Sequence, residues 1–314
     1  MVIERQDMRV SDAIDLFLRD RYLSNCRPAT VRTYRFVLGG FGQWLSRRKY
    51  IALRKLRAEA LSDYLADRLL GGTAARTVHT ERVIILGFVS FLQGRRLLPA
   101  GDWRHAVRRI HVDASKPRCL SPEDMRRLCQ AASCALHYQD SMLRARDIAL
   151  IRLFIDRGLR VTETLALKVQ DIDLETGRIR VRAESAKSRR ERIVWVGHRT
   201  LEALRAYGSF RAKRQARTEA FFITHHGRAL YYSGAYRIIS RIGRLAGIDD
   251  LHPHVLRHSC ATMLLRCGMP LEYVREVLGH ANLRTTELYL HLLDDDLRGQ
   301  CEQHSPVDRL LAGD

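Results

Sequence analysis

The spacing of apolar residues changes once along this 314-residue chain, and that change constrains the fold more than any other feature of the sequence. Between residues 11 and 94, apolar side chains recur three or four positions apart, the period of a helix that buries one face. This pattern predicts four helices: Ser11–Leu23, Pro28 through Leu45, Ala58–Leu70 and Thr77–Leu92. Because no strand pattern interrupts them, we expect residues 1–107 to form a small all-α domain.

After a basic linker over residues 108–118, the pattern becomes mixed. Ser-Pro-Glu-Asp at 121–124 predicts a helix start, with serine as the cap, proline in the first turn and acids near the positive end of the helix dipole. Alternating residues at 178–182 and 192–196 predict two short antiparallel strands, and helical spacing returns beyond Thr200 to the end of the chain. We therefore expect a mainly α fold with a small antiparallel sheet, in which an α+β domain over residues 119–314 follows the all-α domain.

The charge of the chain predicts a polyanionic partner, nucleic acid above all. Lys and Arg number 54 against 35 Asp and Glu, a net charge of +19, and residues 1–118 alone carry 23 against 11, or +12.

The longest apolar run, Val83–Leu92, is about half of a bilayer span, and the N-terminus has no apolar signal core. Seven scattered cysteines without a CxxC pair do not fit a disulfide framework. We expect a cytoplasmic protein with no membrane partner.

The sequence lacks the motifs of several common enzyme classes: no P-loop, Rossmann fingerprint, HExxH or GxSxG occurs. His252, His254 and His258 lie close together, but no carboxylate or thiolate stands beside them at ligand spacing, so we do not expect zinc. The acidic run at 294–296 is contiguous, and its side chains would point in different directions around a helix rather than converge on two metals. We expect no metal site and no cofactor.

Two pairs of residues suit phosphoryl transfer without metal. Arg160 stands at a predicted helix start, and Glu163 lies three residues on, where it can share a helical face with Arg160 and hold its guanidinium. His254 and Arg257 repeat that spacing. Taken alone, each pair fits a surface ion pair or a packed face better; their ordered occurrence together favours a phosphate-binding site.

With these motifs the sequence resembles the tyrosine recombinases, or phage integrases, most closely their Xer-like bacterial branch. The matching stretches follow the order of the family: Gly158–Lys168 with Asp171–Asp173, Ala186–Arg192, His252–His258 and Val277–His291. The resemblance is strong from Cys119 to Leu292 and rests on helical pattern alone before that.

The resemblance implies an enzyme that cuts and rejoins duplex DNA through a 3′-phosphotyrosine, without metal or ATP. Arg160 and Arg257 would bind the non-bridging oxygens of the scissile phosphate, and Tyr289 would be the nucleophile. His254 and His280 would assist proton movement and bind the phosphate. Fixed cationic donors of this kind stabilise the extra charge of a pentavalent phosphorane.

Two further roles follow from the resemblance. Lys187, on the turn between the two predicted strands, would protonate the departing 5′ oxygen as general acid. It is the only lysine between Lys168 and Lys213, although this turn lacks the glycines usual in the family. Glu163 would support Arg160.

The resemblance also implies a partner and an assembly. Residues 1–107 would be a core-binding, SAM-like DNA-binding domain, and the partner would be double-stranded DNA with paired recombination sites. A homo-tetramer, or a hetero-tetramer with a related recombinase, would form on it. Val307, Leu310 and Leu311 share one helical face of the tail, which would dock on a neighbouring protomer or on its own domain. Two alternatives remain: a type IB topoisomerase, and a catalytically silent DNA-binding architectural protein.

Overall fold

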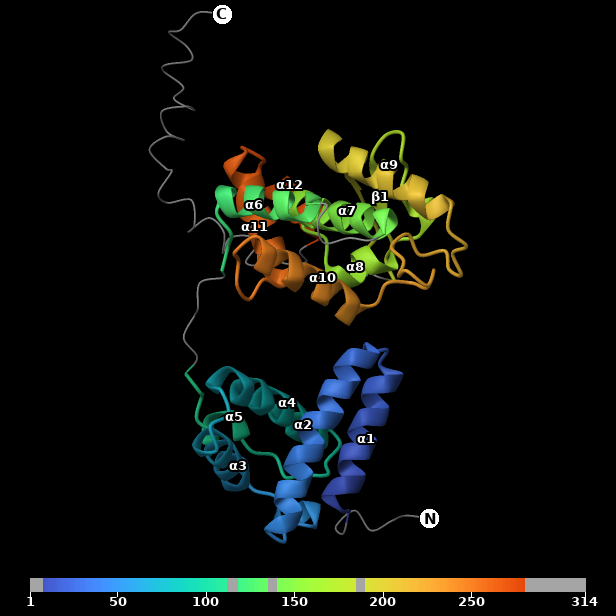
Figure 1. Cartoon of the computed structure of the whole chain (residues 1–314). Coiled ribbons are helices and arrows are strands. Elements are labelled where there is room, and N and C mark those ends of the chain that lie inside the picture. Colours follow the sequence, from blue (N-terminus) through green and yellow to red (C-terminus); the bar gives the residue numbers. More distant parts are fainter. Residues whose placement is uncertain (1–7, 112–117, 135–139, 185–189, 280–314) are drawn as a thin grey trace, which may run out of the picture. The chain divides into compact units, whose positions relative to one another are not determined.

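The computed structural model describes residues 8–111, 118–134, 140–184 and 190–279 (Figure 1). Two compact units make up the chain, residues 1–115 and 116–314, each with a hydrophobic core of its own.

The first unit is built from helices that enclose aromatic side chains. Phe17 packs edge-on against Phe88 and Phe91, with ring centroids 5.6 and 5.2 Å apart. An ion pair between Arg68 and buried Glu81, with Nη2 2.8 Å from Oε1, ties the third helix to the fourth. The helices are α1 (Val10–Leu23), α2 (Pro28–Arg47), η1 (Leu53–Lys55), α3 (Ala58–Leu70), α4 (Ala75–Gly94) and α5 (Trp103–Ala106). The four long ones lie within two residues of the bounds that the apolar spacing predicts.

The second unit opens as the sequence predicts. Ser121 Oγ accepts from the N–H of Asp124 at 3.0 Å, and Asp124 Oδ2 accepts from the N–H of Ser121 at 3.2 Å, a reciprocal cap. The helices that follow are α6 (Pro122–Ser133), α7 (Ser141–Arg157), α8 (Val161–Ala166), η3 (Val169–Asp171), α9 (His198–Ala212), α10 (Tyr232–Leu245), α11 (Pro253–Arg266) and α12 (Leu271–Leu278). Among the helices of the described ranges, none has the length and apolar character to span a bilayer.

The sheet consists of β1 (Arg178–Val181) and β2 (Arg192–Trp195), which pair antiparallel with Ile179 opposite Val194. Ile179, Val181 and Val194 point into the core of the unit. The predicted fold class, mainly α with a small antiparallel sheet, is therefore confirmed.

One expectation is wrong: helical spacing does not continue without interruption beyond Thr200. After α9 the chain runs without a helix from Lys213 to Tyr231. Its residues Phe221–Ile223 are all buried, and the Tyr207 hydroxyl accepts from the N–H of Ile223 at 2.9 Å and donates to the carbonyl of Phe221 at 3.0 Å. The two hydrogen bonds of the Tyr207 hydroxyl thus satisfy backbone groups of a buried segment that has no helical hydrogen bonds of its own.

Candidate active site

A tight turn after α7 brings the candidate site together. Gly158 ends α7 in the left-handed conformation, with φ of 55°. A Cβ at this position would lie 2.8 Å from Leu278 Cδ2 and 3.1 Å from the Cys260 side chain. Only glycine therefore allows the end of α7 to approach α11 and α12 so closely, and the turn places Arg160 at the start of α8.

Arg160 and Glu163 form the pair that their spacing predicts. The Glu163 side chain is fully buried, and its Oε1 accepts from Arg160 Nη1 at 2.8 Å. Its Oε2 accepts from the backbone N–H of Arg160 at 3.0 Å, which satisfies a donor that the first turn of α8 leaves open. The carboxylate is buried and the Arg160 side chain is 19% exposed, so the guanidinium is anchored at one end while part of it remains accessible.

A second arginine shares the same carboxylate. Arg192 donates from Nη2 to Glu163 Oε2 at 2.8 Å and from Nε to the carbonyl of Val277 at 3.0 Å. Sequence reasoning assigned Arg192 only to a strand. The alternation of β2 holds the missed signal, because Arg192 lies on the same strand face as buried Val194, where an arginine needs a buried partner.

The two arginines lower the pKa of Glu163. Burial by itself raises the pKa of this carboxyl, but hydrogen bonds and charge from Arg192 and Arg160 outweigh it, so the pKa of Glu163 lies below its usual value. The carboxylate therefore stays ionised at neutral pH.

We expect Glu163→Gln to lower the free energy of unfolding by about 3–5 kcal/mol at pH 7, because it removes the charge of a fully buried carboxylate that pairs with two guanidiniums. The folded pKa is depressed, so the stabilisation is present above the unfolded value near 4.5 and is lost as the pH falls through the folded pKa. Urea unfolding between pH 3 and 8 measures this, and the variant and the natural chain should converge in acid. Glu202→Gln, an exposed change on α9, is the control and should alter little; an unchanged gap at pH 3 contradicts the assignment.

Arg257 binds two backbone carbonyls that come from different elements. It lies on α11 with 5% of its surface exposed, and it donates from Nη1 to the carbonyl of Gly158 and from Nη2 to that of Leu278, both at 2.7 Å. His254 lies one turn earlier on α11, directly after Pro253, the first residue of the helix, and it is exposed. The predicted His254–Arg257 spacing thus falls on one helix, with the imidazole at the surface and the guanidinium inside.

Three guanidiniums meet at the C-terminal end of α12. Arg192 binds the carbonyl of Val277, Arg257 that of Leu278, and Arg160 that of Gly279, the last at 3.2 Å. The last carbonyls of a helix have no partner within it and carry the negative end of its dipole, which draws cations. The structure therefore brings Arg160, Glu163 and Arg257 to one place, directly before His280.

The remaining predicted site residues, Lys187, His280 and Tyr289, lie outside the described residues, as do residues 112–117 of the predicted linker and the C-terminal tail.

His258, which follows Arg257, is partly buried. Burial, together with the charges of His254, Arg257 and His252, lowers its pKa to about 4. His258 is thus neutral near pH 7.

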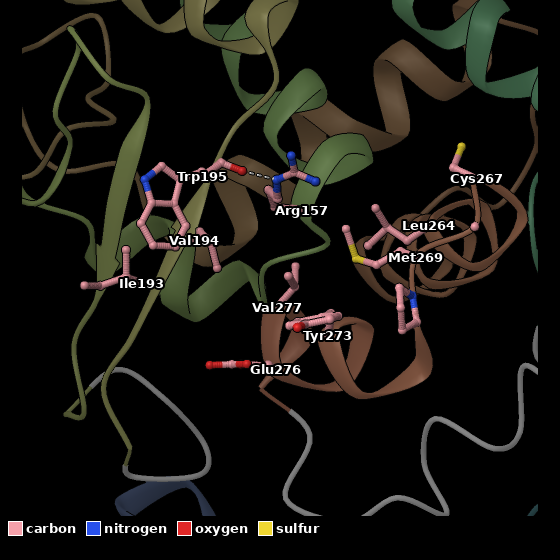
Figure 2. A pocket seen from close by; sticks show the side chains of 12 residues that line it. Arg157, Ile193, Val194, Trp195, Leu264, Cys267, Met269, Tyr273, Glu276 and Val277 are labelled. Carbon is pink, nitrogen blue, oxygen red and sulfur yellow. Dashed lines mark hydrogen bonds between the residues drawn. The ribbon is translucent and has the colours of Figure 1, made fainter. Parts of the chain in front are cut away.

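An apolar pocket is lined by residues of β2, α11 and α12 (Figure 2). Its volume is about 660 Å³, and the Arg157 Nε donates to the carbonyl of Trp195 at its edge. Trp195 and Tyr273 line it and are 58% and 61% exposed. The connection between α11 and α12, residues 267–270, closes one side.

Comparison with solved structures identifies the fold. A XerH site-specific recombinase bound to a palindromic difH substrate superposes with a TM-score of 0.71 at 23% identity, covering 93% of this chain and 84% of that one. A lambda integrase dimer bound to a COC′ core site gives 0.70 at 15% identity, covering 91% and 78%. The fold is that of the tyrosine recombinases.

Sequence comparison gives the family. The model of the phage integrase family matches residues 118–296, so the chain belongs to that family. Tyrosine recombinase XerC of Roseiflexus castenholzii is 35% identical over 186 residues, 58% of this chain and 57% of that protein. Tyrosine recombinase XerA of Saccharolobus solfataricus is 40% identical over 157 residues, 50% of each. The chain thus spans about half the length of these curated relatives.

Proposed function

We propose that this chain is a site-specific recombinase that cuts and rejoins duplex DNA through a covalent 3′-phosphotyrosine, without metal or ATP. The observation that carries the proposal is the meeting of Arg160 and Arg257 at the end of α12, directly before His280. A guanidinium has five N–H donors, so Arg160 can hold Glu163, the Gly279 carbonyl and a phosphate oxygen together.

In the proposed reaction, the Tyr289 oxygen attacks the scissile phosphorus and the bond from phosphorus to the 5′ oxygen breaks. The tyrosine loses its proton with the help of His254 or His280, and Lys187 protonates the departing oxygen. Arg160 and Arg257 stabilise the charge that builds on the non-bridging oxygens. The phosphodiester energy is kept in the phosphotyrosine, so a 5′ hydroxyl can reverse the step and rejoin a strand.

The test is the covalent intermediate. The substrate is a duplex that the full chain selects from a random-sequence library. A series of such duplexes carries a nick at successive positions, so that cleavage near the nick releases a short fragment. The fragment and its 5′ hydroxyl diffuse away, rejoining is prevented, and the adduct accumulates. We expect a protein–DNA adduct on a denaturing gel, removed by protease and formed equally well in EDTA. Strict dependence on Mg²⁺ contradicts the mechanism, DNA binding without adduct favours the architectural protein, and relaxation of supercoils without partner exchange favours the topoisomerase.

The first unit is proposed to supply much of the grip on DNA that does not depend on sequence. Residues 1–118 carry a net charge of +12. Each phosphate contact releases counterions, so the logarithm of the association constant falls linearly with the logarithm of the salt concentration, with a slope of about −0.9 for each contact. A fragment over residues 119–314, which has its own core, is expected to bind more weakly and with a shallower salt dependence in fluorescence anisotropy. If the fragment keeps the slope of the full chain, the charge of the first unit is only a solvated surface.

The pocket of Figure 2 supports a proposal for assembly. The C-terminal segment of one protomer, through Val307, Leu310 and Leu311, is proposed to occupy this pocket on a neighbour and to link four protomers on paired DNA sites. So short an apolar segment is not a stable helix by itself and needs a surface to cover it. Exposed Trp195 and Tyr273 provide one.

Truncation before Ser305 is expected to leave the affinity for a single DNA site within about twofold of that of the full chain. It should impair assembly and recombination on paired sites, because it removes apolar area that only the assembly buries. Analytical ultracentrifugation with paired sites measures the assembly. Trp195→Ala, which removes a wall of the pocket, should give the same loss in a full-length chain. A tetramer that forms normally from the truncated protein overturns the proposal.

A further inference from the structure

Arg192, the first residue of β2, joins three parts of the candidate site. Its guanidinium contacts both oxygens of Glu163, with Nη2 2.8 Å from Oε2 and Nη1 3.3 Å from Oε1. Its Nε donates to the carbonyl of Val277 at the end of α12. The side chain is only 8% exposed, so water does not compete for these bonds. The side chain of Arg192 therefore bridges the sheet, α8 and α12.

We propose that Arg192 is a positioning residue for DNA cleavage: it holds the carboxylate of Glu163 and, through it, the guanidinium of Arg160 that binds the scissile phosphate. The inference rests on the proposed function, because it concerns the step that Arg160 assists. Arg192 and Arg160 reach Glu163 from different elements, β2 and the start of α8.

The hydrogen bonds of Glu163 show how the effect reaches Arg160. Oε1 accepts from a guanidinium nitrogen of each arginine, and Oε2 accepts from Arg192 and from the backbone of Arg160. Both oxygens are thus shared, and the carboxylate cannot turn without losing a bond on each side. Without Arg192 the carboxylate is held from one side only, and Arg160 turns with it. Displacement of a reacting group by about 1 Å can slow a reaction about a hundredfold.

The site requires arginine at this position rather than another cation. Three nitrogens of Arg192 reach two partners in different directions, which the single ammonium of lysine cannot do. The space is also closed on one side, since a Cβ at Gly279 would lie 2.8 Å from Arg192 Nη1. The guanidinium therefore packs against the backbone of the residue that precedes His280.

The test measures the rate of adduct formation by the full chain on the nicked, library-selected duplex. Arg192→Lys and Arg192→Ala are each made alone and together with Arg160→Ala. With Arg160 present, we expect either change to slow the adduct about 10–100-fold while DNA affinity stays within about threefold. In the Arg160→Ala background the same change should cost less than about threefold, because no guanidinium remains to be positioned.

Arg146 offers a matched control. Its side chain is 9% exposed, it pairs with fully buried Asp147 at 2.7 Å, and it also donates to a backbone carbonyl, that of Ile223 at 3.1 Å. Arg146→Lys therefore perturbs a buried network of the same composition elsewhere in the unit. We expect it to change the rate of adduct formation less than about threefold.

Hydrogen exchange of the DNA-free chain provides a second measurement. In Arg192→Lys, amides of residues 161–166 and 271–279 should exchange about tenfold faster, whereas Arg146→Lys should leave them unchanged. An unaltered rate in Arg192→Lys, or the same loss with and without Arg160, overturns the inference. If the natural chain forms no Tyr289-dependent adduct, the proposed function fails; unchanged exchange in Arg192→Lys then overturns the anchoring by itself.

Discussion

Replacing Tyr289 with phenylalanine is expected to abolish the covalent adduct, by at least about a thousandfold, while DNA affinity stays within about twofold. The change removes one hydroxyl and keeps the ring, so packing is preserved and only the attacking atom is lost. Gel separation of the adduct under denaturing conditions and fluorescence anisotropy of binding measure the two quantities on the same duplex.

Tyr236→Phe is the matched control, because it removes the hydroxyl of a tyrosine that is 42% exposed on α10 of the same unit. Its adduct should form at the natural rate. If the adduct persists in Tyr289→Phe, another residue is the nucleophile, and peptide mapping of the labelled adduct identifies it.

Lys187→Ala is expected to slow cleavage of ordinary DNA about 10²–10⁴-fold, the usual contribution of a general acid. The 5′ oxygen leaves poorly as an alkoxide and needs a proton. A sulfur in its place leaves as a thiolate, whose conjugate acid has a pKa near 8.5, so no proton donor is required. Single-turnover rates of the natural chain and of Lys187→Ala should therefore differ on the duplex with oxygen at the bridging position. On the duplex with sulfur at that position the two rates should agree.

Lys213→Ala serves as the control for loss of a lysine in the same unit, and it should behave like the natural chain on both duplexes. A Lys187→Ala variant that stays slow with sulfur at the bridging position contradicts the acid role and leaves Lys187 as a structural residue of the turn.

Local patterns predicted much of the fold. The cap at Ser121, the alternation that gives β1 and β2, and the spacing of Arg160 and Glu163 each depend on residues within one helical turn or one strand, and each appears in the structure as expected. Such features are set by neighbours along the chain, so a single sequence contains the information.

Contacts between distant segments were not predictable in the same way. Arg192 meets Glu163 across 29 positions and Val277 across 85, and no spacing rule links such residues. The path of residues 213–231 likewise depends on a Tyr207 hydroxyl inside the core. The residues of the candidate site were therefore recognisable one by one, but the arrangement of three guanidiniums around the end of α12 was not.

The carbonyls that hold Arg160, Arg192 and Arg257 belong to the backbone of α12, and a backbone group cannot be removed by changing a side chain. Alanine scanning of α12 would therefore leave this support intact and unnoticed. A helix turns about 100° per residue, so one residue inserted within α12 would rotate all three carbonyls relative to its buried face, which Val274 holds in the core. In chimaeras between relatives, the length of α12, more than its side chains, then decides whether the arginines keep their places.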